Sequence, residues 1–118
     1  FDEVYGGNDG NTLLLPENIA AGTLYGGMSA DGADDNKAVV LGQAGTVYGG
    51  YSSGGDSTGN VVELYGKSDD VIGGLSENGN ASGNTVRLFA DTKYVVGVKA
   101  PSGEAFGNIV ELAKQGCV

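Results

Sequence analysis

The feature that most constrains this chain is a tandem repeat with a period of about 24 residues. An apolar pair followed by glycine recurs along the chain, as in Val47-Tyr48-Gly49-Gly50. An asparagine recurs independently with the same period. Two anchors that agree on one period indicate a stack of similar units, because a repeat unit buries its apolar face only against its neighbours.

The residues after each asparagine alternate between apolar and polar with a period of two, which predicts a β-strand. After Asn60, for example, Val62 and Leu64 are expected to face a core with the asparagine, and Glu63 is expected to face outward. No segment shows a helical period. We therefore predict an all-β fold: a parallel β-solenoid (β-helix or β-roll) of about five 24-residue coils, with two main strands per coil.

The whole chain, residues 1–118, is predicted to form a single repeat domain. The coils are placed at approximately 1–23, 24–46, 47–70, 71–94 and 95–118. The first coil is irregular and is expected to act as a cap, as terminal repeats often do. The last coil stops at a unit boundary, which predicts an open strand edge suited to end-to-end pairing.

The inward asparagines are predicted to form a structural ladder at a tight corner, where stacked amides satisfy one another and nearby backbone groups. The glycines are expected to allow close backbone approach or a positive φ. The ladder consists of Asn11, Asn36, Asn60, Asn84 and Asn108.

The composition argues against several classes of function. A net charge of −9 with only six basic residues does not suit binding to nucleic acid, and no apolar run approaches the ~18 residues of a membrane span. Histidine is absent, which removes the commonest general base and metal ligand. The lone Cys117 cannot form an intramolecular disulfide. We therefore predict a protein that is not an enzyme and has no cofactor.

Aromatic residues that recur at fixed repeat positions are the first candidate binding site. If the aliphatic residue before each tyrosine faces inward, the tyrosines form an outward stripe that could stack on sugar rings or contact a partner. The alternative is that they cover the rim of the core. The candidate stripe consists of Tyr5, Tyr25 and Tyr48, which share one repeat position, together with Tyr65 and Phe89, which share another just after the second strand.

An acidic turn is the second candidate. Asp31, Asp34 and Asp35 gather carboxylates of the kind that calcium prefers. The acidic positions do not repeat from unit to unit, so a solvated turn is the favoured interpretation and calcium is the alternative.

The segment from Val47 to Leu64 resembles the glycine-rich repeats in passenger regions of bacterial autotransporters and adhesin-like surface proteins, and the resemblance extends from Val4 to Leu112. It implies secretion to the bacterial cell surface or beyond. It also implies a structural or adhesive role through surface or end-to-end protein association. The expected partners are the chain itself, other cell-surface proteins or glycans. A self-assembling filament subunit with strand-edge stacking and a carbohydrate-binding solenoid remain alternatives.

Overall fold

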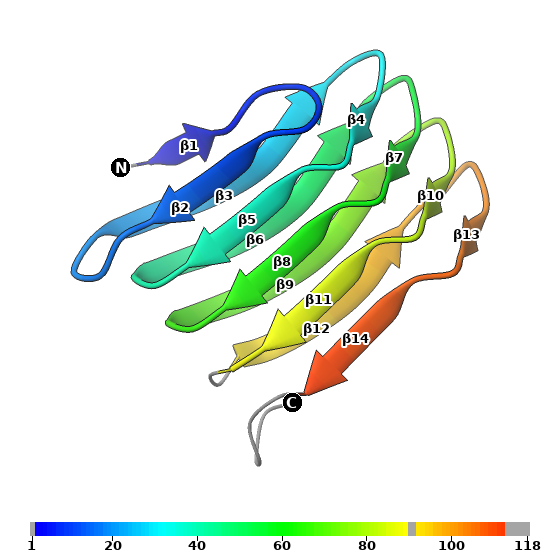
Figure 1. Cartoon of the computed structure of the whole chain (residues 1–118). Helices are drawn as coiled ribbons and strands as arrows, with labels where there is room; N and C mark the ends of the chain where they lie inside the picture. Colours follow the sequence, from blue (N-terminus) through cyan, green and yellow to red (C-terminus); the bar gives the residue numbers. More distant parts are fainter. Residues whose placement is uncertain (1, 90–91, 113–118) are drawn as a thin grey trace.

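The computed structural model describes residues 2–89 and 92–112, apart from the side chains of 92–98 and 112. It shows an all-β chain wound into a parallel β-solenoid of about four turns, close to the predicted five (Figure 1). The predicted fold class is therefore confirmed. Cys117 lies outside the described residues.

Three parallel sheets run along the solenoid, and each middle coil contributes one strand to each sheet. The first sheet contains β1 (Glu3–Tyr5), β3 (Ala20–Ser29), β6 (Gln43–Ser52), β9 (Lys67–Ser76) and β12 (Thr92–Lys99). The second contains β2 (Thr12–Leu15), β5 (Lys37–Val40), β8 (Val61–Leu64), β11 (Thr85–Leu88) and β14 (Ile109–Leu112). The third contains the two-residue strands β4 (Ala33–Asp34), β7 (Ser57–Thr58), β10 (Ala81–Ser82) and β13 (Ala105–Phe106).

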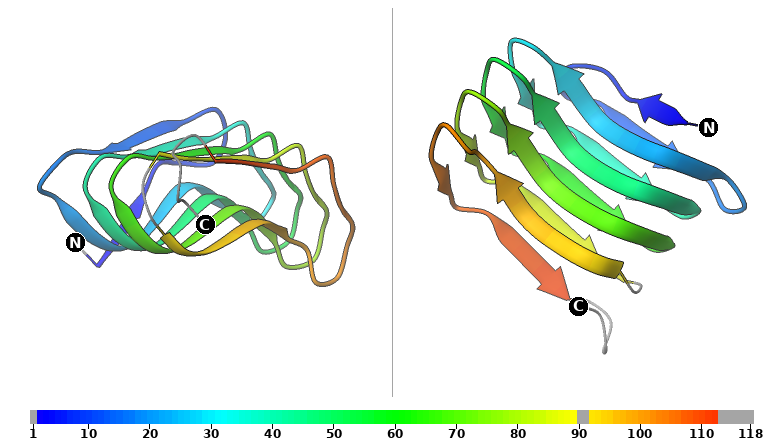
Figure 2. Two further views of the ribbon diagram at one scale, coloured as in Figure 1. Left: turned by 90° about the horizontal axis from the view of Figure 1, so that it is seen from below. Right: turned by 180° about the vertical axis from the view of Figure 1, so that it is seen from behind.

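The first two sheets contain the two main strands expected for each coil. The third sheet is a short face at one end of the cross-section. The view from below in Figure 2 shows successive coils following one another with a similar outline. The coils are in strict register, since Val62 of β8 is paired with Ala38 of β5 on one side and Val86 of β11 on the other.

The core lies between the first and second sheets. The alternation predicted for the second sheet is confirmed, because Val62 and Leu64 are fully buried while Glu63 between them is partly exposed. Fully buried aliphatic residues of the first sheet complete this core: Leu24, Val47 and Val71. Burial of such side chains contributes about 1.5–3 kcal/mol each relative to exposure.

The residue before each asparagine turns the corner in the left-handed conformation. Gly59, Gly83 and Gly107 have φ of 65°, 63° and 66°. In the second coil Asp35 occupies this place with φ of 56°. Glycine recurs there because an L-residue in this region brings its Cβ too close to the backbone, whereas Asp is one of the few residues that tolerate it.

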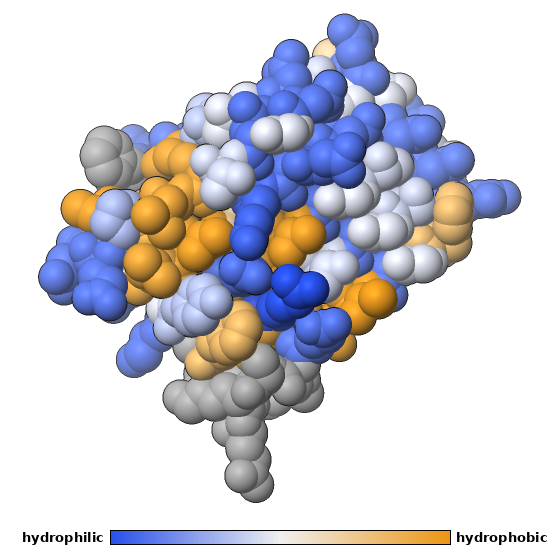
Figure 3. Space-filling view, in the orientation of Figure 1, coloured by the Kyte–Doolittle hydropathy of each residue, from blue (hydrophilic) through white to orange (hydrophobic). Residues whose placement is uncertain are grey.

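The outer face of the second sheet combines an apolar end with a row of ion pairs. Leu14 on β2 is 52% exposed. Farther along, Glu63 pairs with Lys37 at 3.3 Å and with Arg87 at 3.2 Å, and Arg87 also pairs with Glu111 at 3.0 Å. Figure 3 shows this face, with hydrophobic side chains gathered over β2 and β5. Within residues 2–89 and 92–112, no helix is long and apolar enough to cross a membrane.

Candidate functional site

The five predicted ladder asparagines lie in one column, and each donates hydrogen bonds to the side-chain oxygen of the next. Asn60 Oδ1 accepts from the backbone N of Asn36 at 3.0 Å and from its Nδ2 at 3.1 Å. In turn, the backbone N and Nδ2 of Asn60 donate to Oδ1 of Asn84 at 2.9 and 3.0 Å. The same pattern joins Asn11 to Asn36 and Asn84 to Asn108.

The amide of Asn60 also holds the neighbouring turn. Its Nδ2 donates to the carbonyl oxygen of Ala33 at 2.8 Å and to Oγ of Ser57 at 3.0 Å. Among the described residues, every buried side-chain nitrogen and oxygen has a partner. Burial of the polar column is therefore compensated, because a buried polar group is costly only when its hydrogen bonds are missing.

The second glycine of each Gly-Gly pair makes room for an asparagine. A Cβ added to Gly50 would lie 2.5 Å from Cγ of Asn60, and one added to Gly74 would lie 2.5 Å from Nδ2 of Asn84. Any side chain at these positions would displace an amide of the ladder. The two sequence anchors thus share one period because they contact each other across the solenoid.

The first sheet positions Tyr5, Tyr25 and Tyr48 as a stack on its outer face. These tyrosines are in register on β1, β3 and β6, next to inward aliphatic residues such as Val47. The ring centroids of Tyr5 and Tyr25 are 5.0 Å apart, as are those of Tyr25 and Tyr48, and the planes lie within 5° of parallel. The fourth place in the column is taken by Ile72, which is 4% exposed.

Tyr51 packs against this stack edge-on. Its ring lies 5.7 Å from that of Tyr25 and 5.6 Å from that of Tyr48, at nearly right angles to both. Perpendicular contacts of this kind are favourable because the positive edge of one ring meets the negative face of another. Four tyrosines thereby form a single rigid aromatic cluster, in which Tyr5 is 49% exposed and the other three are partly buried.

Carboxylates border this cluster. The hydroxyl of Tyr5 donates to Oε2 of Glu3, and the hydroxyl of Tyr51 donates to Oε1 of Glu77. Asp70 of β9 lies in register with Thr46, two residues before the tyrosine column. We use the term tyrosine face for Tyr5, Tyr25, Tyr48 and Tyr51 together with Glu3, Asp70 and Glu77.

The tyrosine phenols are held in the neutral form. Burial, and then the nearby charge of Asp70, raise the pKa of Tyr48. Burial is also the main cause that raises the pKa of Tyr25. Repulsion from Tyr48 in its ionised form and from the Glu3 carboxylate follows. The hydrogen bond to Glu3 is the main cause that raises the pKa of Tyr5. The cluster therefore presents neutral hydroxyl groups beside negative carboxylates at neutral pH.

Tyr65 and Phe89 lie apart from the tyrosine face. They follow β8 and β11 of the second sheet, where their rings stack with centroids 4.4 Å apart. Tyr65 is 45% exposed. The five aromatic residues of the candidate site thus form two separate stacks, one on the first sheet and one just beyond two strands of the second sheet.

In the acidic turn, one carboxylate connects two coils. Oδ1 of Asp34 accepts from the backbone N of Thr58 at 3.2 Å and from its hydroxyl at 2.6 Å, while Asp35 turns the corner before Asn36. Asp31 is exposed. Within the part of the chain that the structure describes, no three acidic, histidine or cysteine residues are placed to hold a metal. Asp34 therefore bridges two coils through Thr58, and a solvated turn stays the favoured prediction for these residues, with calcium as the alternative.

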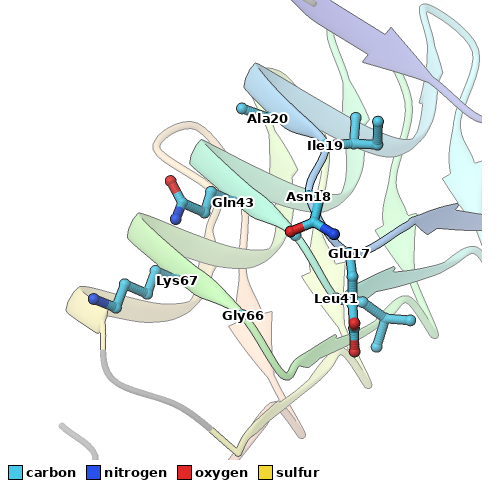
Figure 4. Close-up of a pocket in the computed structure, with 9 residues that line it drawn as sticks. Glu17, Asn18, Ile19, Ala20, Leu41, Gln43, Gly66 and Lys67 are labelled. Carbon is cyan, nitrogen blue, oxygen red and sulfur yellow. The ribbon is translucent and has the colours of Figure 1, made fainter.

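A hollow of about 410 Å³ lies beneath the long connection that follows β2. Figure 4 shows Gln43 and Lys67 extending from successive strands on one side, with Glu17 and Leu41 on the other. Its lining side chains include one carboxylate and one ammonium group but no hydroxyl, thiol or imidazole. Glu17 and Lys67 are thus the charged side chains that line the hollow.

Sequence analysis missed Tyr51 and the three carboxylates, Glu3, Asp70 and Glu77, as members of the site. Tyr51 shares its repeat position with Met28 and Leu75, so no aromatic column marked it. Glu77 lies just beyond β9, in a turn where an acidic residue carries no periodic signal.

Comparison of this chain with protein-family models, curated proteins and solved structures found no match.

Proposed function

We propose that the chain is a non-catalytic structural and adhesive β-solenoid module that binds a protein partner through its tyrosine face. The observation that carries this proposal is the packing of four outward tyrosines into one cluster. Tyrosine is enriched at binding hot spots because it offers a large, rigid contact area and a polar tip.

The scaffold suits such a role because it holds the cluster without mobile loops. Tyr25 and Tyr48 lie within ten-residue strands that are paired on both sides. The asparagine ladder and aliphatic core fix the spacing between these strands. A partner would therefore meet a surface that is already ordered, which lowers the entropic cost of binding.

The proposed location is the bacterial cell surface or the extracellular space. The sequence likeness to surface-protein repeats supports it, and so does the regular solenoid scaffold. The absence of histidine supports a non-catalytic role.

A protein partner is favoured over a glycan by the orientation of the rings. Sugars stack on aromatic faces, but both faces of Tyr25 are covered by Tyr5 and Tyr48. With its faces covered, Tyr25 can present only its ring edge and hydroxyl group to a partner, beside the ring of Tyr51. Such edges suit a polar peptide surface better than the apolar face of a sugar.

End-to-end association is a second candidate function, favoured by one observation. Val110 of β14 is 43% exposed, whereas Val62 and Val86 at the same repeat position are fully buried. No described strand pairs with the outer edge of β14. A second copy would bury this surface in a filament, so the mass measured by sedimentation velocity is expected to rise with concentration. A constant monomer mass would exclude this function.

The main proposal is tested by the binding of the module to a panel of purified extracellular proteins that spans acidic to basic isoelectric points. Biolayer interferometry compares the wild type with the Tyr25→Ser/Tyr48→Ser variant, and circular dichroism checks that each variant is folded. Loss of two hot-spot residues is expected to weaken binding about tenfold or more. The matched control, Leu14→Ser/Tyr65→Ser, changes exposed residues of the second sheet and is expected to retain binding. No binding by the wild type, or equal losses in both variants, would refute the proposal.

A further inference from the structure

The two outer faces of the solenoid differ in whether their carboxylates form ion pairs with basic side chains. On the second sheet, Lys37 and Arg87 neutralise Glu63, and Arg87 also reaches Glu111. On the tyrosine face, by contrast, the carboxylates of Glu3, Asp70 and Glu77 take part in none of the ion pairs found among the described residues. Glu3 and Glu77 instead accept hydrogen bonds from neutral tyrosine hydroxyls. Among the described residues, therefore, no basic side chain forms an ion pair with Glu3, Asp70 or Glu77.

Two of these carboxylates stand at a defined separation along the solenoid. Glu3 is in register with Thr23, Thr23 with Thr46, and Thr46 with Asp70. Three steps between parallel strands of about 4.8 Å place Glu3 and Asp70 about 14 Å apart along the axis. Thr23 and Thr46 between them leave the middle of this row small and uncharged.

An extended peptide matches this separation. It advances about 3.3 Å per residue, so side chains four residues apart point the same way and lie about 13 Å apart. The side chain midway between them would lie over Thr23 and Thr46, beside the tyrosine stack. Glu77, next to Tyr51, adds negative charge on the other side of the cluster.

We propose that the tyrosine face binds an extended basic segment of the partner, with two Lys or Arg side chains four residues apart contacting Glu3 and Asp70. This inference rests on the proposed function, because it names the chemistry that the same surface recognises. Charge complementarity supports it, since desolvated charged pairs at an interface impose register and exclude wrong partners. The tyrosine cluster supplies the apolar contact area between the charged ends.

The test uses three short synthetic peptides that carry a fluorophore and share one length. The first has two arginines four residues apart with valine midway between them. The second has the same composition with the arginines adjacent, and the third has glutamate in place of arginine. Fluorescence anisotropy with the whole chain is expected to show tightest binding for the first peptide, weakened by added salt.

Two protein variants with equal loss of charge make the test specific. Glu3→Gln/Asp70→Asn is expected to weaken binding of the first peptide about tenfold. Glu17→Gln/Glu104→Gln changes exposed carboxylates elsewhere and is expected to leave affinity within about twofold. Equal losses in the two variants would show attraction to net charge alone and would overturn the proposal, as would equal binding of the two arginine peptides.

The two proposals fail in different ways. If a panel protein binds through Tyr25 and Tyr48 but no arginine peptide binds, the inference about the basic segment is wrong and the proposed function stands. If the panel shows no binding that depends on these tyrosines, the proposed function itself fails.

Discussion

The contact between Gly50 and Asn60 permits a quantitative test of the packing that fixes the coil. Asn60 is fully buried and takes part in hydrogen bonds with Asn36, Ala33, Ser57 and Asn84. Asn60→Ala removes the acceptor of the backbone N–H of Asn36. Because a buried group without a partner costs about 1–3 kcal/mol and several are affected, we expect a loss of about 2–4 kcal/mol.

Gly50→Ala should cost a similar amount by a different route. Its methyl group would occupy the space of the Asn60 amide, which must then leave its partners. If the glycine serves only to admit the amide, the double variant should be no less stable than Asn60→Ala alone. We therefore expect the two losses to be non-additive by about 2 kcal/mol, within the range typical of residues in contact.

Urea unfolding of the wild type, both single variants and the double variant, followed by circular dichroism, measures these free energies. Hydrogen exchange of the Asn36 amide gives a local readout and is expected to accelerate in all three variants. Asn11→Ala is the matched control, because Asn11 lies at the partly exposed end of the same ladder and should cost about 1 kcal/mol or less. If the double variant loses the sum of the single losses, the reasoning is refuted.

Three further predictions concern the corner, the ion pairs and the tyrosines. Asp35→Gly is expected to stabilise the chain by up to about 1 kcal/mol, since φ of 56° suits glycine; a lower melting temperature would contradict this. Glu63→Gln is expected to cost at most about 1 kcal/mol, and a cost that does not shrink in high salt would contradict the ion-pair assignment. Because folding raises the pKa of Tyr48, its contribution to stability is full below pH 10.0 and is lost as the pH rises through the folded pKa. Tyr48→Phe should therefore flatten the alkaline fall in unfolding free energy, and an unchanged fall would show that Tyr48 contributes little.

The main outline of the fold could be predicted from the sequence because it depends on local alternation. Val62 and Leu64 alternate with Glu63, and this pattern recurs every coil, so inward and outward positions follow directly. The third sheet could not be predicted, because strands such as Ser57–Thr58 have two residues and leave no period to detect.

The candidate site was predictable only in part. Tyr5, Tyr25 and Tyr48 recur in one column, whereas Tyr51 joins them through a perpendicular contact that no repeat position reveals. Asp34 shows a different limit of prediction from sequence. A carboxylate in a turn looks the same in sequence whether it faces a cation or, as here, binds Thr58 of the next coil.

The asparagine ladder also has a direction, which bears on how such a chain can change in length. The bonds between ladder amides all run one way: Nδ2 of Asn36 donates to Oδ1 of Asn60, and Nδ2 of Asn60 donates to Oδ1 of Asn84. Duplication or deletion of one whole coil would therefore restore each donor to an equivalent acceptor. The ladder accommodates one extra residue within a coil, since Asn11 and Asn36 are 25 residues apart whereas Asn36 and Asn60 are 24 apart. What the ladder requires is one asparagine in each coil, so large natural length variants should differ by the gain or loss of whole repeats.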